Sequence, residues 1–269
     1  MAKLIVRGLE TNVEVWNESA DEVLVALHGF TGSTATWRNL ANKLPNVRVV
    51  AIDCIGHGKT AVPEEESRFS MEQQIKDLDE IVAQLHLEKF SLLGYSMGGR
   101  IALSYAIAYP ERLEKLILES ASPGLRTEKE RNERRQSDYL LAEKIERNGI
   151  PSFVDAWEKI ALFDSQKRLP DDVQQAIRKE RLAQSEAGLA GSLKGIGTGM
   201  QPSNWPYLAN LDVPVLVITG AMDEKFCRIA SEMQILLKNA RHVIVNDVGH
   251  AIHVENPSEF ATIVEKYLM

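Results

Sequence analysis

The hydrophobic residues of the chain follow two alternating patterns. Residues 71–87, 98–113 and 227–240 carry apolar residues at helical spacing. Around them lie short, almost continuously apolar runs, which read EVLVALHG (22–29), VRVVAIDC (47–54), FSLLGYS (90–96), LEKLILES (113–120), VPVLVITG (213–220) and RHVIVND (241–247). Such runs are typical of parallel strands that are buried on both faces of a sheet. The alternation predicts an α/β fold with a mostly parallel, doubly wound sheet.

One stretch interrupts this alternation. Residues 122–201 are charged, follow a helical pattern and contain no convincing strand, and the strand pattern resumes at Val213. We therefore expect a core formed by residues 1–121 and 202–269, with an all-helical cap insertion at 122–201. The cap should lie over the carboxyl ends of the strands, where open α/β sheets bind their ligands. The glycine-rich segment GSLKGIGTGM follows no strand and is interpreted as flexible chain within the cap.

Composition and charge narrow the class of protein. The 269 residues are 44% apolar and 26% charged, which is ordinary for a soluble globular protein. The net charge of −7 argues against a nucleic-acid binder, because such proteins present a basic surface to the phosphates. No apolar run is long enough to span a membrane, and the N-terminus lacks the pattern of a signal peptide. With no CxxC spacing, Cys54 and Cys227 are expected to be free thiols in a cytoplasmic protein.

A nucleophile motif follows the third apolar run. Residues 94–98 read GYSMG and match G-x-S-x-G, between a predicted strand and an apolar helix. The glycines permit a tight strand-to-helix turn that presents the hydroxyl of Ser96 above the sheet. Because a serine hydroxyl is a weak nucleophile, it needs a base in contact with it. Ser96 is therefore the candidate nucleophile.

The partners of the serine are expected later in the chain, in the order acid and then histidine. The segment NDVGHAIHVENP supplies His250 and His253 after the last strand, and we favour His250 because it directly follows a glycine in a loop. The acid must orient that imidazole and stabilise its charged form. Asp223, just past a strand end, is the favoured acid, and Glu119 at the end of LILES is the alternative.

Two backbone N–H groups are expected to form an oxyanion hole. One should belong to Met97, directly after the serine, and the other to Phe30 in LHGFTGS, where His28 and Gly29 shape the turn. His57 in DCIGHGKT also follows a strand. It precedes the serine, which is the wrong chain order for the base, so a structural role in its loop is the better interpretation.

Together these segments resemble the α/β-hydrolase fold family over essentially the whole chain. Within that family, the chain most resembles the 2-succinyl-6-hydroxy-2,4-cyclohexadiene-1-carboxylate synthases of menaquinone biosynthesis. The resemblance rests on the segments LHGFTGSTATW, GYSMGGR, SPGL with the following RRQSD, and GHAIHVENP. The resemblance implies a lyase that eliminates pyruvate from 2-succinyl-5-enolpyruvyl-6-hydroxy-3-cyclohexene-1-carboxylate. It further implies that the serine, activated by histidine, acts as the base, so that no acyl-enzyme is needed.

The resemblance also implies a set of residues that bind this small polycarboxylate substrate, namely Arg100, Arg134, Arg181, Tyr95 and Trp157. A second argument supports Arg100, because a guanidinium in a buried apolar helix needs an anionic partner. That partner is either the ligand or an internal acid such as Glu119. The cap arginines can also be explained as one solvated helix face with i,i+4 ion pairs, and Trp157 as packing on an apolar stripe.

Other functions remain open at this point. The same triad would serve a carboxylester hydrolase or a hydrolase of carbon–carbon bonds in acidic ring-cleavage products. A non-catalytic receptor with this fold would bind a ligand in the same pocket, although it would not need to keep Ser96, Asp223 and His250 together. No G-x-G-x-x-G after a first strand, no P-loop and no His/Cys cluster is present, so neither a cofactor nor a metal is expected.

Overall fold

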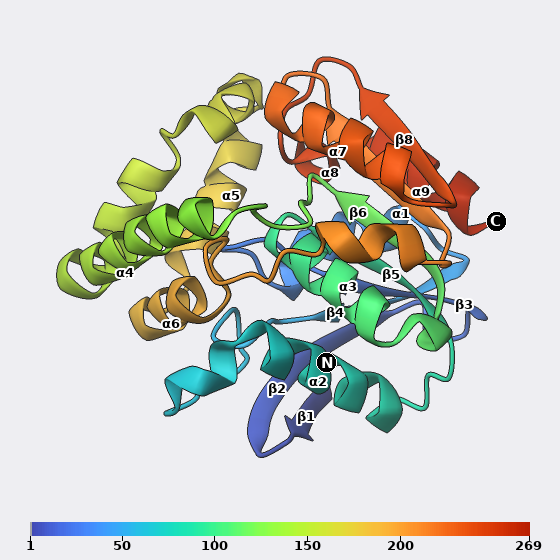
Figure 1. Ribbon diagram of the computed structural model, residues 1–269, viewed down its shortest axis with the longest axis horizontal. Coiled ribbons are helices and arrows are strands. Elements are labelled where there is room, and N and C mark those ends of the chain that lie inside the picture. Colours follow the sequence, from blue (N-terminus) through green and yellow to red (C-terminus); the bar gives the residue numbers. More distant parts are fainter. Residues whose placement is uncertain (1) are drawn as a thin grey trace.

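The six predicted strands and two further strands form one sheet of eight strands in the order β1-β2-β4-β3-β5-β6-β7-β8 (Figure 1). The structure is a computed structural model that describes residues 2–269. Each neighbouring pair from β4 to β8 in that order is parallel, which confirms the predicted mostly parallel α/β sheet. These strands are β3 (Glu22–Leu27), β4 (Val47–Ile52), β5 (Phe90–Tyr95), β6 (Leu113–Glu119), β7 (Val215–Gly220) and β8 (Ala240–Val245).

The remaining two strands form an N-terminal hairpin that the sequence analysis missed. Strand β1 (Ala2–Val6) pairs antiparallel with β2 (Leu9–Trp16), and β2 in turn pairs antiparallel with β4. The turn consists of Arg7 and Gly8, which have φ angles of 47° and 86°. Arg7 is held there by an ion pair of 2.9 Å between its Nη1 and a carboxylate oxygen of Asp77. The hairpin extends the sheet at the edge farthest from β8.

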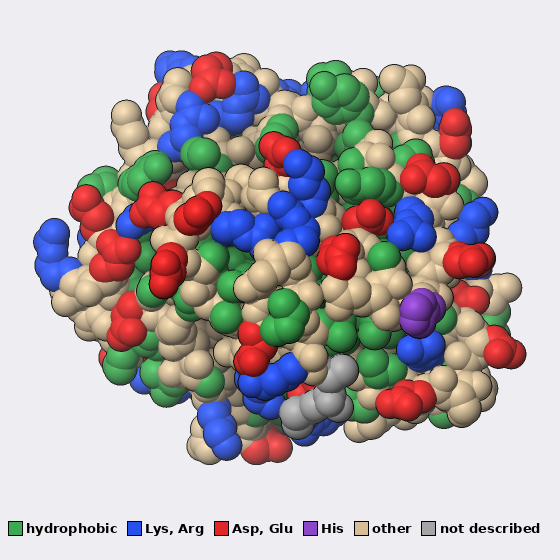
Figure 2. Space-filling view, turned by 90° about the horizontal axis from the view of Figure 1, so that it is seen from below, with side chains coloured by type: hydrophobic (Ala, Val, Ile, Leu, Met, Phe, Trp, Pro, Cys, Tyr) green, Lys and Arg blue, Asp and Glu red, His purple; other side chains and the backbone are tan. Residues whose placement is uncertain are grey.

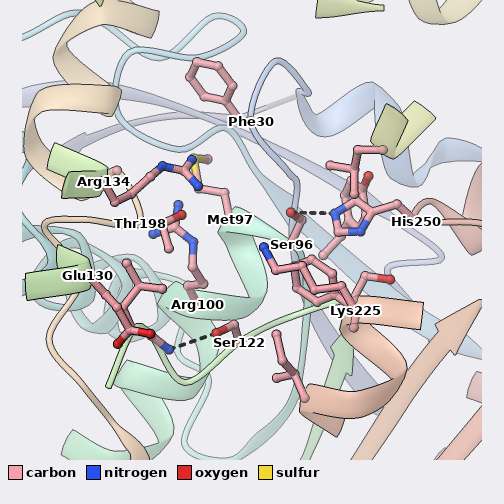
Figure 3. Close-up of a pocket in the computed structure, with 18 of the residues that line it drawn as sticks. Phe30, Ser96, Met97, Arg100, Ser122, Glu130, Arg134, Thr198, Lys225 and His250 are labelled. Carbon is pink, nitrogen blue, oxygen red and sulfur yellow. Dashed lines mark hydrogen bonds between the residues drawn. The ribbon is translucent and has the colours of Figure 1, made fainter. Parts of the chain in front are cut away.

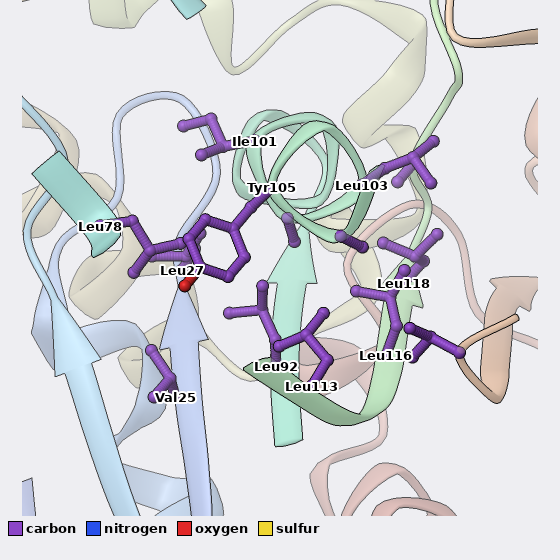
Figure 4. Close-up of a cluster of buried hydrophobic side chains, with 14 of the residues drawn as sticks. Val25, Leu27, Leu78, Leu92, Ile101, Leu103, Tyr105, Leu113, Leu116 and Leu118 are labelled. Atoms are coloured by element: carbon purple, nitrogen blue, oxygen red, sulfur yellow. The ribbon is translucent and has the colours of Figure 1, made fainter. Parts of the chain in front are cut away.

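Helices cover both faces of the sheet. On one face lie α2 (Met71–Gln84), α3 (Met97–Ala108) and α7 (Glu224–Leu236), and on the other α1 (Arg38–Lys43) and α9 (Pro257–Leu268). Alternate strand residues point to opposite faces, so Val25 and Leu27 join the α2–α3 core, whereas Leu24 and Ala26 join the α1–α9 core. Figure 4 shows α3 above its strands, with Ile101 and Tyr105 packed among leucines of the sheet.

Residues between β6 and β7 are helical. They form α4 (Glu128–Trp157), α5 (Asp171–Leu182) and α6 (Glu186–Ile196), and α4 is bent where Gly149 has a φ of 79°. Helices α4 and α6 share a small apolar core of their own. The expectation of flexible chain from residue 191 onward is wrong, because α6 continues to Ile196. Gly191 and Gly195 are needed in that helix, since a Cβ on either would lie within 2.6 Å of Phe69.

The remaining short elements connect these layers. They are α8 (Ile252–Glu255) and the 3₁₀ turns Thr34–Trp37, Glu66–Phe69, Pro110–Arg112, Ala161–Arg168 and Trp205–Asn210. No helix in residues 2–269 is long and apolar enough to cross a membrane. Cys54 and Cys227 are both free. Figure 2 shows acidic and basic side chains mixed over the face that it presents.

Candidate active site

Ser96 sits in a strained turn between β5 and α3. Its φ and ψ angles are 50° and −104°, a combination that a residue with a side chain rarely adopts. The turn is tight because Gly98 approaches β3 so closely that a Cβ there would lie 2.3 Å from the carbonyl oxygen of Leu27. The amide of Ser96 donates to the carbonyl of Glu119 at 2.8 Å, which fixes the turn to β6. Strain that is held in this way is typical of functional sites.

The structure brings together the three residues that chain order suggested. The hydroxyl of Ser96 donates to Nε2 of His250 at 3.0 Å (Figure 3). Nδ1 of His250 donates to a carboxylate oxygen of Asp223 at 2.6 Å. Because a carboxylate only accepts, the proton of the neutral ring lies on Nδ1, and Nε2 is left free to accept the serine proton. The other oxygen of Asp223 accepts from the amide of Phe226 at 3.2 Å and so caps α7.

The alternative acid and the alternative base pair with each other. The carboxylate of Glu119 accepts from both the backbone N–H and Nδ1 of His253, at 3.0 Å and 2.9 Å. Glu119 is fully buried, and the imidazole of His253 packs against the ring of Tyr95 with centroids 4.6 Å apart. Within the described residues neither side chain hydrogen-bonds to the side chains of the triad, and the pair joins the end of β6 to α8.

The loop that carries His250 is fixed by contacts that the sequence analysis missed. The carboxylate of Glu255 accepts from the amides of Gly249 and Ala251, on either side of the histidine, at 2.7 Å and 3.2 Å. The ring of Phe226 packs edge-on against the imidazole at 4.7 Å. The spacing of Glu255 five residues after His250 is a local signal that could have indicated this support.

A cavity of about 330 Å³ opens in front of Ser96. This is the lower end of the size range for small-molecule sites. Helices and loops from both the core and the 122–201 segment supply its walls. The lining residues include Phe30, Tyr95, Ser96, Met97, Arg100, Ser122, Arg126, Glu130, Arg134, Trp157, Phe163, Ser192, Thr198, Lys225, Phe226, Glu232 and His250.

The residues expected to form the oxyanion hole lie in this lining. Met97 is the first residue of α3 and Phe30 lies in the loop after β3. Neither amide donates to another protein group in the described chain, so both are available to a ligand. His28 supports the loop from beneath, because its Nε2 accepts from the amide of Cys54 at 3.0 Å.

His57 lies outside the cavity lining. It is buried behind Phe30 and packs against His28, with ring centroids 5.9 Å and 5.2 Å away. Burial lowers the pKa of His57 to about 3. Its contacts therefore match the structural role that the sequence suggested and place it away from Ser96.

Arg100 faces the cavity one helical turn beyond Ser96 (Figure 3). Its Nη1 donates to the carbonyl of Ile196 at 2.6 Å, and no carboxylate in the described chain pairs with it. Glu119, the internal acid considered above, is already bound to His253. Burial, with a contribution from the charge of Arg134, lowers the pKa of Arg100 to about 10. A bound anion would offset both the cost of burial and the repulsion by Arg134, and it would therefore stabilise the charged form of Arg100.

The two arginines expected from the 122–201 segment differ in their position. Arg134 lines the cavity, and its Nε is bound to Asp138 at 2.7 Å while 43% of its side chain stays exposed. Arg181 does not reach the lining of this cavity. It lies beyond Phe163, with its guanidinium 4.6 Å above that ring, and it donates to Gln166 at 3.1 Å. Burial lowers the pKa of Arg181.

Tyr95 and Trp157 both line the cavity. Tyr95 packs against His250 with ring centroids 5.5 Å apart, and burial raises the pKa of its phenol. Trp157 packs between Phe30 and Phe163, and its indole N–H has no partner in the described chain. Trp157 therefore both packs against neighbouring aromatic rings and lines the cavity. No group of three or more His, Cys, Asp or Glu side chains that could hold a metal ion occurs in residues 2–269.

Comparison with known proteins agrees with this architecture. A family model described as the alpha/beta hydrolase fold matches residues 22–257, which is most of the chain. The chain belongs to the α/β-hydrolase fold family. The resemblance stated from the sequence is thereby confirmed for the fold.

Particular relatives within the α/β-hydrolase fold family are also similar to this chain. A Bacillus subtilis (strain 168) protein is 50% identical over 93% of this chain and 91% of its own, and it is named as a candidate 2-succinyl-6-hydroxy-2,4-cyclohexadiene-1-carboxylate synthase. An Enterobacter sp. (strain 638) protein with the same synthase name is 33% identical over 91% of both chains. The solved structure of MenH from S. aureus superposes with a TM-score of 0.91, at 39% identity over 96% of this chain and 97% of that one.

Proposed function

We propose that this protein is a carbon–oxygen lyase that converts 2-succinyl-5-enolpyruvyl-6-hydroxy-3-cyclohexene-1-carboxylate to 2-succinyl-6-hydroxy-2,4-cyclohexadiene-1-carboxylate and pyruvate, a step of menaquinone biosynthesis. One observation carries the proposal. Ser96, whose hydroxyl is hydrogen-bonded to His250, lies in the same cavity as Arg100, whose guanidinium has no carboxylate partner in the described chain. The relatives of 50% and 33% identity that bear the synthase name support it.

The chemistry needs a base, because the proton on the ring carbon beside the succinyl carbonyl must leave. In the proposed mechanism the hydroxyl of Ser96 gives its proton to His250, and the resulting alkoxide takes the ring proton. The ring double bond then shifts, the carbon–oxygen bond to the enolpyruvyl group breaks, and the departing enolate is protonated to pyruvate. Asp223 stabilises the imidazolium that forms at His250.

Charge develops on the succinyl carbonyl oxygen as the ring proton leaves. Two free amide groups of Phe30 and Met97 would donate to that oxygen, which is the role of an oxyanion hole. Arg100 and Arg134 would bind substrate carboxylates, and Tyr95 and Trp157 would pack against the ring. Arg181 would act on the substrate only if the segment that carries it moves toward the cavity, since it lies behind Phe163.

We further propose that residues 122–201 are the cap of this site. They contribute Arg134, Trp157 and Ser192 to the cavity wall. A cap that encloses the substrate would exclude water, which would otherwise compete for the catalytic proton and weaken the charge interactions.

A direct experiment measures pyruvate release from the enolpyruvyl substrate with coupled lactate dehydrogenase, alongside hydrolysis of p-nitrophenyl acetate. We expect fast pyruvate release and negligible ester hydrolysis. Ser96→Ala and His250→Ala should each reduce kcat by several orders of magnitude, about 10³-fold or more, because the triad acts as a unit. Ester hydrolysis without pyruvate release would instead identify the chain as an esterase and contradict the proposal.

A further inference from the structure

A second cation without an acidic partner faces the reactive serine. Lys225 lies in the first turn of α7, two residues after Asp223, and it lines the same cavity as Ser96 and His250. Figure 3 shows its side chain reaching from α7 toward Ser96, with its ammonium end on the side of the serine that also carries Arg100 and Arg134. No sequence motif singles it out.

The position of Lys225 is electrostatically unfavourable for the protein alone. The N-terminal end of a helix carries partial positive charge, so a cation in the first turn costs free energy. Its ammonium lies 5.6 Å from the centroid of the Phe226 ring, and it forms no ion pair within the described residues. Glu224, beside it in the chain, is instead bound to Arg228 at 3.6 Å. A ligand anion would supply the missing partner.

The four cations of the lining differ in what already binds them. Arg126 is bound to Glu232 at 2.5 Å and Arg134 to Asp138 at 2.7 Å. Only Arg100 and Lys225, among the lining residues that the structure describes, have no carboxylate partner. Arg100 is largely enclosed, whereas Lys225 is exposed. The cavity therefore offers one enclosed and one exposed anion-binding group.

We infer that Lys225 binds the carboxylate of the enolpyruvyl group, the part of the substrate that leaves as pyruvate. This inference rests on the proposed function. The substrate carries three carboxylates, and the one that departs needs a partner from which it can exchange to water quickly. An exposed ammonium on a flexible stem suits that task, because its ion pairs are weak and well hydrated. The enclosed guanidinium of Arg100 suits a carboxylate that stays with the ring.

The test compares wild type with Lys225→Met, Lys225→Arg and a control, Lys238→Met. Lys238 follows α7 and is bound to Asp212 on the surface, outside the cavity lining. Product formation is followed by the absorbance of the conjugated diene, with added pyruvate or 2-succinylbenzoate as inhibitor. The second compound carries the ring and succinyl carboxylates but no pyruvate, so it occupies only the other part of the site.

We expect Lys225→Met to weaken inhibition by pyruvate, and to lower kcat/KM, by about three- to fivefold, which is the size of effect that an exposed ion pair gives. Inhibition by 2-succinylbenzoate should change less than about twofold, and Lys225→Arg and Lys238→Met should remain close to wild type. Equal pyruvate inhibition in Lys225→Met and wild type would overturn the inference, as would weakened inhibition by 2-succinylbenzoate alone. Absence of wild-type turnover would instead reject the proposed function.

Discussion

The side chains around Ser96 differ in how far the sequence could predict them. Ser96, Asp223 and His250 follow local signals, namely a turn motif and positions just past strand ends, and the structure places all three in one hydrogen-bonded chain. Arg181 and Lys225 depend on how a helix is rotated against its neighbours. Counting along the chain cannot supply that rotation, so Arg181 was expected in the cavity and Lys225 was overlooked.

The buried guanidinium of Arg100 leads to a prediction about pH. Its pKa is lowered to about 10, so the wild-type side chain stays charged between pH 7 and 9. A lysine there starts from a lower pKa, and burial would lower it further into that range. Since a group is neutral above its pKa, Arg100→Lys should lose its attraction for a carboxylate as the pH rises.

The measurement is KM for the enolpyruvyl substrate across a buffer series from pH 7 to 9. We expect KM of Arg100→Lys to rise by about tenfold relative to wild type over this range, which corresponds to the loss of one charged hydrogen bond. A parallel pH dependence of KM in both proteins would show that Arg100 does not contact a substrate carboxylate.

Among the secondary-structure elements, the parallel strands could be predicted because their residues are apolar on both faces. The β1–β2 hairpin was missed, since polar residues interrupt its short strands and its turn depends on Arg7 and Gly8. The end of α6 was missed for a different reason. Its glycines suggested flexible chain, whereas they are required by contact with Phe69, a residue more than a hundred positions earlier.

The contact between β6 and α8 leads to a prediction about stability. Glu119 and His253 form a buried pair, and removing one partner of such a pair leaves an uncompensated polar group. Glu119→Ala should lower the free energy of unfolding by about 3–5 kcal/mol. Urea denaturation of the variant and wild type would measure the difference.

A matched control is Glu72→Ala, which removes an exposed ion pair of 2.5 Å with Lys76 on α2. It should change the free energy of unfolding very little, because exposed ion pairs are screened by solvent. If both variants unfolded at the same urea concentration, the Glu119–His253 contact would not hold β6 and α8 together as described.

At the scale of the whole molecule, the order of strands and helices could be predicted, and so could the helical segment between β6 and β7. The shape of the cavity could not, because it arises where loops from the core meet helices that are distant in sequence. The overall charge of −7 likewise gives no hint that the described lining holds four Lys and Arg residues but only two carboxylates.

The contrast between the negative net charge of the protein and the excess of Lys and Arg in the cavity lining leads to a prediction about ionic strength. If the local cations dominate the encounter with an anionic substrate, added potassium chloride should lower kcat/KM, because the Debye length falls to about 10 Å at 0.1 M. We expect a several-fold decrease between low salt and about 0.3 M. A rise in kcat/KM with salt would show that repulsion by the net negative charge prevails. Sucrose at matched viscosity serves as the control.

The acid of the triad serves both the catalytic site and the stability of α7, which affects how the triad would change during evolution. Asp223 uses one carboxylate oxygen to orient His250 and the other to cap α7. Loss of such a cap costs about 1 kcal/mol of stability. In a descendant protein that had lost the reaction, this aspartate would therefore still be retained, because α7 depends on it. Ser96, whose backbone is strained, could then be replaced by other residues. The serine, rather than the acid, is the residue whose presence indicates a working enzyme.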